Sequence, residues 1–522
     1  MAEFKIKDGV LVKYSGAGSE VVVPNGVISI GARAFEEIKT ITSITIPDGV
    51  TSIGKMAFYQ CSSLKSINLP DSIQEIGSFA FWNCHALEEV RLPKDISKIE
   101  HGTFDDCWAL RSVDIPDGLS EIGNNAFQYC RRLESVILPP SLTKVGAFAF
   151  ANCEALTQIE LPKKVYEVGS YAFWGCKRLS KFIVHSPTLK LDDTVLLKDE
   201  RLSEVDVPIS ALGAIFKANS LTVRGDGKIP PKSFSDSGIT SLVLDGEIEI
   251  GESAFSNCKY LKTVTLSHKV KVIGTQAFSR CSQLSNVTLP DSLIEIGSMA
   301  FSDCEGLLAI VIPNTVKTLG NWTFSGCKNL TSAILPSDLS VIPFGLFKSC
   351  KKLASIDLPK GISVIEEEAF ANCQSLTSVV IPKSVTSIEK YAFSACSELT
   401  SINLPNGITL IEFGLFQYCK KLASLSIPEG VTEIQNNAFK GTSIEKIVIP
   451  KSVKSIGCTT FDECLSLREV LFDRKDGWYI TSTFAKTRID MDVSDPGQNA
   501  TNLLKFDTST VDAFYYCKWK RD

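Results

Sequence analysis

The sequence predicts an α/β solenoid that is rich in β-structure, with a parallel β-sheet on one face and short turns or one-turn helices on the other. A motif of the form L-x-S-I-x-L-P-x-x-[VIL]-x-x-I-G-x-x-A-F-x-x-C returns every 23 residues. Its prolines keep strict register from Pro24 to Pro162 and again from Pro290 to Pro428. A fixed period of roughly 20 to 50 residues is typical of solenoids, whose units bury their apolar faces against one another.

Composition and charge narrow the class of protein. The 522 residues carry a net charge of −5 at pH 7, and the pI is near 5.7, which argues against a nucleic-acid footprint. No apolar run reaches the roughly 18 residues of a membrane-spanning helix. The opening stretch MAEFKIKDGVLVKYSG has no apolar core of a secretory signal. We expect either a cytoplasmic chain or a chain whose export signal is missing from this sequence.

The first segment, residues 1–23, does not carry the full motif. The stretch FKIKDGVLVKYSGAGSEVVVP alternates apolar and polar residues and breaks at Gly16 to Gly18. This pattern predicts a hairpin. As a terminal element it is expected to close the open end of the first coil.

Each repeat unit contains three segments, as the unit at residues 64–84 shows. In its strand, three apolar residues are expected to point inward: Leu64, Ile67 and Leu69. The residues between them are expected to face solvent: Lys65, Ser66 and Asn68. Pro70 ends the strand because proline has no N–H to donate to a ladder. A second extended edge with Ile73 and Ile76 follows, and the A-F-x-x-C segment has the spacing of one inward-facing helical turn.

The repeat divides the remaining chain into four parts. Residues 24–181 form a first array, residues 182–244 irregular repeats, residues 245–470 a second array and residues 471–522 a C-terminal cap. Apolar strand residues persist in the irregular part, so we expect a continuous solenoid there, with a change of curvature. With about two degraded units, the repeat phenylalanines predict roughly 20 coils. They are Phe35, Phe58, Phe81, Phe104, Phe127, Phe150, Phe173, Phe234, Phe255, Phe278, Phe301, Phe324, Phe347, Phe370, Phe393, Phe416, Phe439 and Phe461.

Most of the 17 cysteines follow the repeat phenylalanine by three residues. Stacked strands lie about 4.8 Å apart, farther than the ~3.8 Å between Cβ atoms that a disulfide prefers, so we expect buried free thiols. Cys458 and Cys517 lie outside this pattern, and the four scattered histidines give no zinc spacing. We expect no enzyme activity, metal or cofactor. The ladder positions are Cys61, Cys84, Cys107, Cys130, Cys153, Cys176, Cys258, Cys281, Cys304, Cys327, Cys350, Cys373, Cys396, Cys419 and Cys464.

The repeat resembles the BspA-like subclass of bacterial leucine-rich-repeat proteins. The stretch IPKSVTSIEKYAFSACSEL carries the subclass pattern, and the tail segments GWYIT and DVSDPGQNA resemble the end that often follows such arrays. The resemblance covers nearly the whole chain. It implies a right-handed leucine-rich-repeat arc, a location outside the cell or at its surface, and adhesion to host proteins or other cells. It supplies no catalytic residue.

The solvent-facing strand residues are the first candidate for a binding site. In the first array they are charged, as at Lys65, Glu88, Glu89, Arg91, Arg111, Asp114, Glu134 and Glu160. In the second array they become small or apolar. Exposed apolar patches usually mark interfaces, although valine and isoleucine are also good strand formers. The candidate partner-binding residues are Leu308, Val311, Ile334 and Val380.

Two weaker candidates lie elsewhere. Aromatic residues near the turns of the first array offer interface anchors, or they pack between coils: Tyr59, Trp82, Trp108, Tyr129 and Trp174. The tripeptide Arg224-Gly225-Asp226 matches the cell-attachment sequence, with an ordinary turn as the alternative. From all of this we expect a non-enzymatic module that binds a protein or a glycan at the cell surface. An intracellular scaffold is the alternative.

Overall fold

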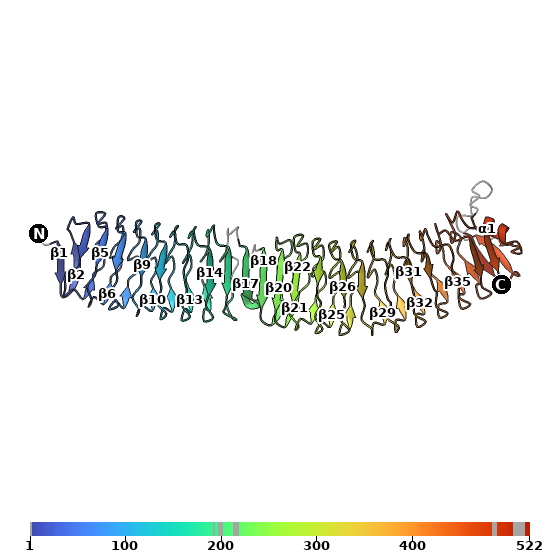
Figure 1. Ribbon diagram of the computed structural model, residues 1–522, viewed down its shortest axis with the longest axis horizontal. Coiled ribbons are helices and arrows are strands. Elements are labelled where there is room, and N and C mark those ends of the chain that lie inside the picture. Colours follow the sequence, from blue (N-terminus) through green and yellow to red (C-terminus); the bar gives the residue numbers. More distant parts are fainter. Residues whose placement is uncertain (1–2, 192–193, 197–201, 212–218, 483–487, 505–516) are drawn as a thin grey trace. The chain divides into compact units, whose positions relative to one another are not determined.

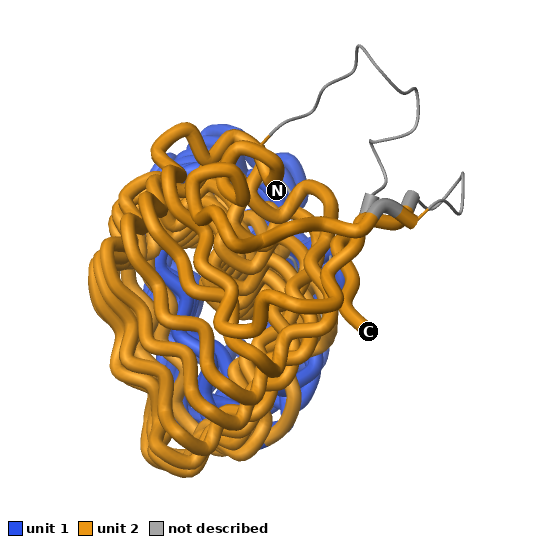
Figure 2. The backbone as a smooth tube through the Cα atoms, turned by 90° about the vertical axis from the view of Figure 1, so that its right-hand side faces the viewer, with its two compact units in different colours: residues 1–226 blue, residues 227–522 orange. Residues whose placement is uncertain are grey.

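The computed structural model describes residues 3–191, 194–196, 202–211, 219–482, 488–504 and 517–522 (Figure 1). The chain divides into two compact units, Met1–Asp226 and Gly227–Asp522. Each unit is a stack of coils, and successive coils of unit 2 follow the same path (Figure 2). Most regular coils contribute a first strand before the repeat proline and a second, short strand after it, whereas residues 134–138, 354–358 and 423–427 form no first strand. The solenoid that the repeat predicted is thereby confirmed in each unit.

In unit 1 the strands form parallel ladders along both sides of the coils. The first strands are β3 (Glu20–Val22), β5 (Ser43–Thr45), β7 (Ser66–Asn68), β9 (Glu89–Arg91), β11 (Ser112–Asp114), β14 (Gln158–Leu161), β16 (Lys181–Val184), β17 (Glu204–Pro208) and β18 (Ser220–Arg224). The second strands are β4 (Ser29–Ile30), β6 (Ser52–Ile53), β8 (Glu75–Ile76), β10 (Lys98–Ile99), β12 (Glu121–Ile122), β13 (Lys144–Val145) and β15 (Glu167–Val168). A 3-10 turn, η1 (Ile209–Ala211), follows β17.

Unit 2 repeats the arrangement with more coils. Its first strands are β20 (Ser241–Asp245), β22 (Thr263–Leu266), β24 (Asn286–Val287), β26 (Ala309–Val311), β28 (Ser332–Ile334), β31 (Ser378–Val379), β33 (Ser401–Ile402), β36 (Lys446–Ile449) and β38 (Glu469–Phe472). Its second strands are β19 (Gly227–Ile229), β21 (Ile248–Ile250), β23 (Val272–Ile273), β25 (Glu295–Ile296), β27 (Thr318–Leu319), β29 (Val341–Ile342), β30 (Val364–Ile365), β32 (Ser387–Ile388), β34 (Leu410–Ile411), β35 (Glu433–Ile434) and β37 (Ser455–Ile456).

The core runs along the axis of each unit, and the repeat phenylalanines form its centre. Phe58 and Phe81 are fully buried, and their rings stack with centroids 5.1 Å apart. The strand residues point as the alternation predicted, with Leu64, Ile67 and Leu69 buried and Lys65, Ser66 and Asn68 exposed. The motif glycine is required by packing, because a Cβ on Gly77 would lie 2.6 Å from the backbone nitrogen of Lys55 in the preceding coil.

The segment around the repeat phenylalanine is not the helical turn that the spacing predicted. Phe79 and Asn83, two residues on either side of Phe81, have φ angles of +60° and +62°. The N–H of Phe81 donates 2.9 Å to the carbonyl of Thr103 in the next coil, whereas a helix would direct it to its own turn. A left-handed residue costs about 1–2 kcal/mol. Hydrogen bonds from coil to coil offset that cost and leave the segment as a turn.

The thiols have a structural role inside this turn. Cys84 Sγ donates 3.1 Å to the carbonyl oxygen of Phe58 in the preceding coil, and the contact recurs along both arrays. All fifteen ladder cysteines are buried and free, as expected; the side chain of Cys517 lies outside the described residues. In two coils that lack the cysteine a hydroxyl takes its place, since Ser237 contacts Cys258 and Thr442 contacts Cys464; in the coil of Phe35 the position is Ile38.

Both ends carry elements that differ from the repeat. At the N-terminus β1 (Phe4–Lys7) and β2 (Val10–Tyr14) form an antiparallel hairpin, and β2 pairs with β4. The hairpin turn lies at Asp8 and Gly9, both with positive φ, and not at the predicted Gly16–Gly18 break. Paired positive φ values are typical of the tight hairpin turn. Gly16 instead packs against the Tyr14 hydroxyl.

At the C-terminus antiparallel pairing ends the second-strand ladder of unit 2. Strand β41 (Cys517–Arg521) lies between β37 and β39 (Trp478–Ser482), and β39 also pairs with β40 (Arg488–Asp490). Helix α1 (Pro496–Leu504) begins where Asp495 accepts hydrogen bonds from the N–H groups of Gly497 and Gln498. Buried Asn499 ties the helix to the array by donating to the Val470 carbonyl.

Candidate functional site

Seven consecutive coils of unit 2 present, before their repeat prolines, an outward surface with almost no charge over residues 285–426. Over seven consecutive coils the outward side chains are all exposed, and only Asp357 among them is ionisable. We call this surface the seven-coil face. It consists of Ser285, Asn286, Thr288, Leu308, Ala309, Val311, Thr331, Ser332, Ile334, Ala354, Ser355, Asp357, Thr377, Ser378, Val380, Thr400, Ser401, Asn403, Ala423, Ser424 and Ser426.

The predicted apolar candidates lie within this face. Val311 and Ile334 are direct neighbours across β26 and β28, with 57% and 59% of their surface exposed. Leu308 lies on the same coil as Val311 and is 54% exposed, and Val380 is 78% exposed two coils beyond Ile334. The structure therefore brings Leu308, Val311 and Ile334 together and places Val380 at the same repeat position farther along. Their apolar surface remains in contact with water.

Hydroxyl groups of the face are held by hydrogen bonds between coils. Thr331 Oγ1 donates 2.9 Å to the carbonyl of Leu308, and Thr400 Oγ1 donates 3.1 Å to that of Thr377. The Asn403 amide accepts from the N–H of Ile381 and donates to its carbonyl. Side chains fixed in this way lose little conformational entropy when a partner binds.

The corresponding surface of unit 1 differs in charge and in shape. It is hollowed over β7, β9 and β11, where a depression of about 690 Å³ is lined by Glu89, Arg91, Asp114, Asp117 and Ile137, among others. Arg91 forms an ion pair with Asp71 at 3.0 Å. Ile137 is 86% exposed. Ile137 occupies the same repeat position as Val311. The sequence therefore placed Ile137 on the outward surface, but the candidate residues did not include it.

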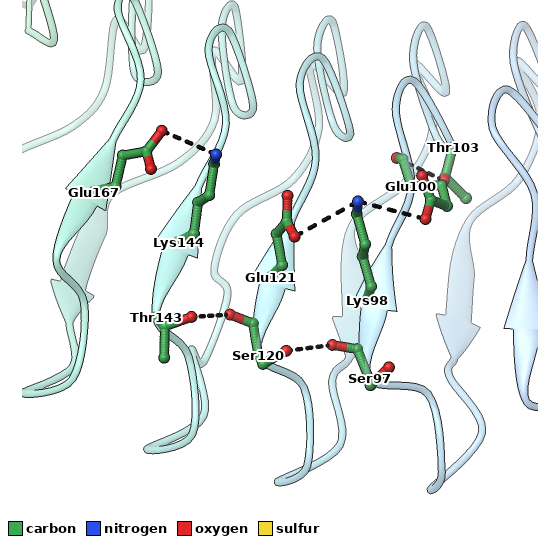
Figure 3. Close-up of polar contacts among 9 residues, drawn as sticks. All are labelled: Ser97, Lys98, Glu100, Thr103, Ser120, Glu121, Thr143, Lys144 and Glu167. Atoms are coloured by element: carbon green, nitrogen blue, oxygen red, sulfur yellow. Dashed lines mark hydrogen bonds and ion pairs between the residues drawn. The ribbon is translucent and has the colours of Figure 1, made fainter.

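The second-strand surface of unit 1 is occupied by its own ion pairs. Lys98 and Lys144 alternate with Glu121 and Glu167, at 3.5 Å between Lys98 and Glu121 and 3.0 Å between Lys144 and Glu167 (Figure 3). The hydrogen bond and charge of Glu167 raise the pKa of Lys144. Exposed ion pairs of this kind contribute little to stability, because water and salt screen them. A surface whose charges are paired internally offers few groups to a ligand.

Beside these charges, a ladder of hydroxyls joins the same coils. Ser120 Oγ donates 3.0 Å to the Ser97 carbonyl, and Thr143 Oγ1 donates 2.9 Å to the Ser120 carbonyl (Figure 3). The threonines of the seven-coil face make the same kind of hydrogen bond, from a hydroxyl to a carbonyl of the preceding coil. We therefore assign the hydroxyl ladders to coil stacking on both sides of the solenoid.

The aromatic residues of the unit 1 turns pack between coils. The rings of Tyr59 and Trp82 stack at 4.8 Å. Trp108 lies between the His85 imidazole at 4.1 Å and the Arg131 guanidinium at 5.2 Å, with 41% of its surface exposed. Trp174 is partly buried and also makes an interaction with another residue of the chain. With both ring faces covered, Trp108 presents mainly its edge.

An acidic residue beside these aromatic side chains has a raised pKa. Burial, together with the adjacent charge of Asp106, raises the pKa of Asp105 to about 7. Asp106 itself accepts a hydrogen bond from the Trp108 indole. The carboxyl group of Asp105 is therefore protonated, and so neutral, in a substantial fraction of molecules near neutral pH.

The Arg224-Gly225-Asp226 tripeptide lies at the end of β18. The Arg224 guanidinium forms an ion pair with Asp206 at 2.7 Å and donates 3.1 Å to the Val184 carbonyl. Gly225 has a φ of +94°. Asp226 also has an interaction partner. These contacts favour a structural role for the tripeptide, because its arginine is engaged by the neighbouring coils.

The described residues contain no cluster of side chains with the composition of a metal site. Burial raises the pKa of the Cys61 thiol to about 12, and it also raises that of Cys84. Such thiols are poor nucleophiles because the thiolate is the reactive form. Within the described part of the chain, no helix has the length and apolarity needed to cross a membrane.

Comparison with known proteins identifies the class. The chain belongs to the BspA-type leucine-rich-repeat family, whose repeat region matches residues 12–134, 120–217, 227–354 and 340–468. No curated protein matches it.

Solved structures of bacterial leucine-rich-repeat proteins are among its structural neighbours. A leucine-rich cell surface protein from Faecalibacterium prausnitzii is 27% identical, with 76% of this chain and 92% of that one covered and a TM-score of 0.34. A leucine-rich-repeat protein from Bacteroides ovatus is 24% identical, with 83% and 91% covered and a TM-score of 0.35.

Proposed function

We propose that this protein is a non-enzymatic binding module, secreted or attached to the cell surface, that contacts a partner protein through the seven-coil face. The observation that supports the proposal is the loss of charge over this face. In unit 1, the five coils that contain Lys65 to Glu160 carry eight charged outward residues, whereas seven coils of unit 2 carry one. Depletion of charge marks the centres of protein interfaces.

The size of the face agrees with a protein partner. Its 21 outward side chains match the roughly 20–30 residues that each side of a standard interface contributes. The exposed apolar side chains of Leu308, Val311 and Ile334 supply the part that a partner would cover. Extracellular-matrix proteins are the first partners to test, because the family resemblance implies adhesion. A cytosolic partner is the alternative.

The test is a double substitution, Val311→Asp and Ile334→Asp, measured against the partner that a pull-down from matrix proteins and from cytosol identifies. Both side chains point outward, so circular dichroism should show an unchanged fold. Two buried like charges should weaken binding at least tenfold, or about 1.4 kcal/mol. Ile137→Asp, at the matching position of unit 1, is the control. If the double variant binds like the parent while Ile137→Asp fails, the hollow of unit 1 is the interface and the proposal is wrong.

A further inference from the structure

One coil of unit 2 is shorter than its neighbours. Leu422 follows the repeat phenylalanine Phe416 by six residues, whereas Ile444 follows Phe439 by only five. The residue is lost between the turn and the first strand, where the preceding coil carries Lys420 and Lys421. Length changes in single repeats map to loops on one face, which is often a binding face.

An open depression of about 860 Å³ lies where this residue is missing. We call it the notch. Ligand sites typically enclose about 300–1,000 Å³, so its size fits a small ligand. Its lining comes from five successive coils and includes Tyr418, Lys420, Ser443, Glu463, Leu465 and Ser466.

The floor of the notch is held in place by the surrounding coils. Tyr418 has a φ of +61°, and its ring lies on Gly441, where a Cβ would be 2.6 Å from the ring. The Lys440 ammonium forms ion pairs with Asp462 at 2.7 Å and with Glu463 at 3.1 Å, and these contacts raise the pKa of Lys440. A floor fixed by packing and ion pairs is preorganised for a ligand.

The walls present polar groups, some of which also bond to neighbouring coils. Lys420 forms no ion pair with any residue that the structure describes. Glu463 keeps 54% of its side chain exposed despite its ion pair, and Leu465 is 95% exposed at the rim. The hydroxyls of Ser443 and Ser466 lie between these walls, and Ser443 Oγ donates 2.5 Å to the Lys420 carbonyl, so that its oxygen is left to accept from a ligand. The notch therefore combines a cation, an acceptor carboxylate, hydroxyls and an apolar surface.

The geometry points to a neutral sugar residue of a glycan as the ligand of the notch. Each sugar hydroxyl both donates and accepts, which suits Glu463 and Lys420 together, and the C–H face of the ring suits Leu465. An anionic ligand would be repelled by Glu463, and a cationic ligand would be repelled by Lys420. A purely apolar ligand would leave both charged groups desolvated without partners, which is costly.

The experiment uses the full-length protein and the methyl glycosides of glucose, mannose, galactose and N-acetylglucosamine as probes. Saturation-transfer NMR detects binding, and a titration gives the Kd. The proposal expects at least one glycoside to bind. The decisive variant inserts one lysine between Thr442 and Ser443, which restores the usual coil length and fills the notch. It should raise the Kd at least tenfold.

A matched control exists in the same chain. The coil of Phe234 also lacks one residue between its turn and its first strand, since Ile239 follows Phe234 by five, and a lysine inserted between Ser237 and Gly238 should leave sugar binding unchanged. Lys420→Met, an exposed substitution, tests the notch without altering its length and should also weaken binding at least tenfold. The proposal fails if no glycoside binds, if the filled notch or Lys420→Met binds sugar like the parent, or if an acidic peptide binds instead. The seven-coil face is untouched by these changes, so the two proposals are tested separately.

Discussion

Removing one ring from the phenylalanine stack tests whether unit 2 behaves as a one-dimensional array. Phe301 is fully buried, and its ring lies 5.5 Å from that of Phe278 and 5.7 Å from that of Phe324. Phe301→Ala leaves a cavity and breaks both ring contacts. Truncation of a buried phenylalanine costs about 3–5 kcal/mol, of which each aromatic pair accounts for about 0.5–1.5 kcal/mol.

The loss should be local, because each coil contacts only its neighbours. Hydrogen exchange monitored by mass spectrometry should show faster exchange in the coils of Phe278, Phe301 and Phe324 and little change near Phe439. Ser302→Ala, next to the same phenylalanine but partly exposed, is the control and should change stability by less than about 0.5 kcal/mol. A uniform rise in exchange over residues 245–470 would refute the reasoning.

Three further predictions concern the turns. Thiol titration should find at least about 12 reactive groups after denaturation without reductant and few in the native protein, since burial hides them; fewer than about six after denaturation would indicate disulfides. Gly102→Ala should destabilise unit 1 by more than about 1 kcal/mol, because Gly102 has φ +61° and lies against the Phe79 ring; Gly361→Ala, with open space around it, should not. Since the folded pKa of Asp105 is raised to about 7, stability should fall as pH rises from about 4 to 7; Asp105→Asn should raise Tm more at pH 8 than at pH 5, and equal shifts would contradict the assignment.

The sequence predicted the parts of the fold that depend on which residues face inward. Periodicity alone placed Leu64, Ile67 and the repeat phenylalanines in the core, and the structure confirms it. It could not predict the path of the turn, because A-F-x-x-C has the same spacing in a helical turn and in a turn with two left-handed residues. A signal was present, however. At some left-handed positions an aromatic residue is followed one coil later by glycine, as Phe79 is by Gly102 and Tyr391 by Gly414, whereas Phe148 is followed by Tyr171.

For the candidate site, the sequence predicted which single side chains face outward but did not predict the shape of the surface. It selected Val311 and Ile334 as outward, and the structure pairs them across adjacent strands. The hollow over β9 and β11 and the notch beside Tyr418 were not predicted. Both depend on how loops of neighbouring coils are spaced. A repeat pattern read one unit at a time does not contain that information, although the missing residue before Ile444 was visible.

The bond from each thiol to the preceding coil has a consequence for biogenesis. Cys84 reaches its acceptor, the carbonyl of Phe58, only after the earlier coil has closed. A chain emerging from the ribosome presents an unprotected thiol about every 23 residues until the next coil is laid down, and the N-terminal hairpin is the first template available. In an oxidising compartment, coil closure therefore competes with wrong disulfide formation. Successive addition of coils, beginning at the N-terminus, removes each thiol from that competition soon after it appears.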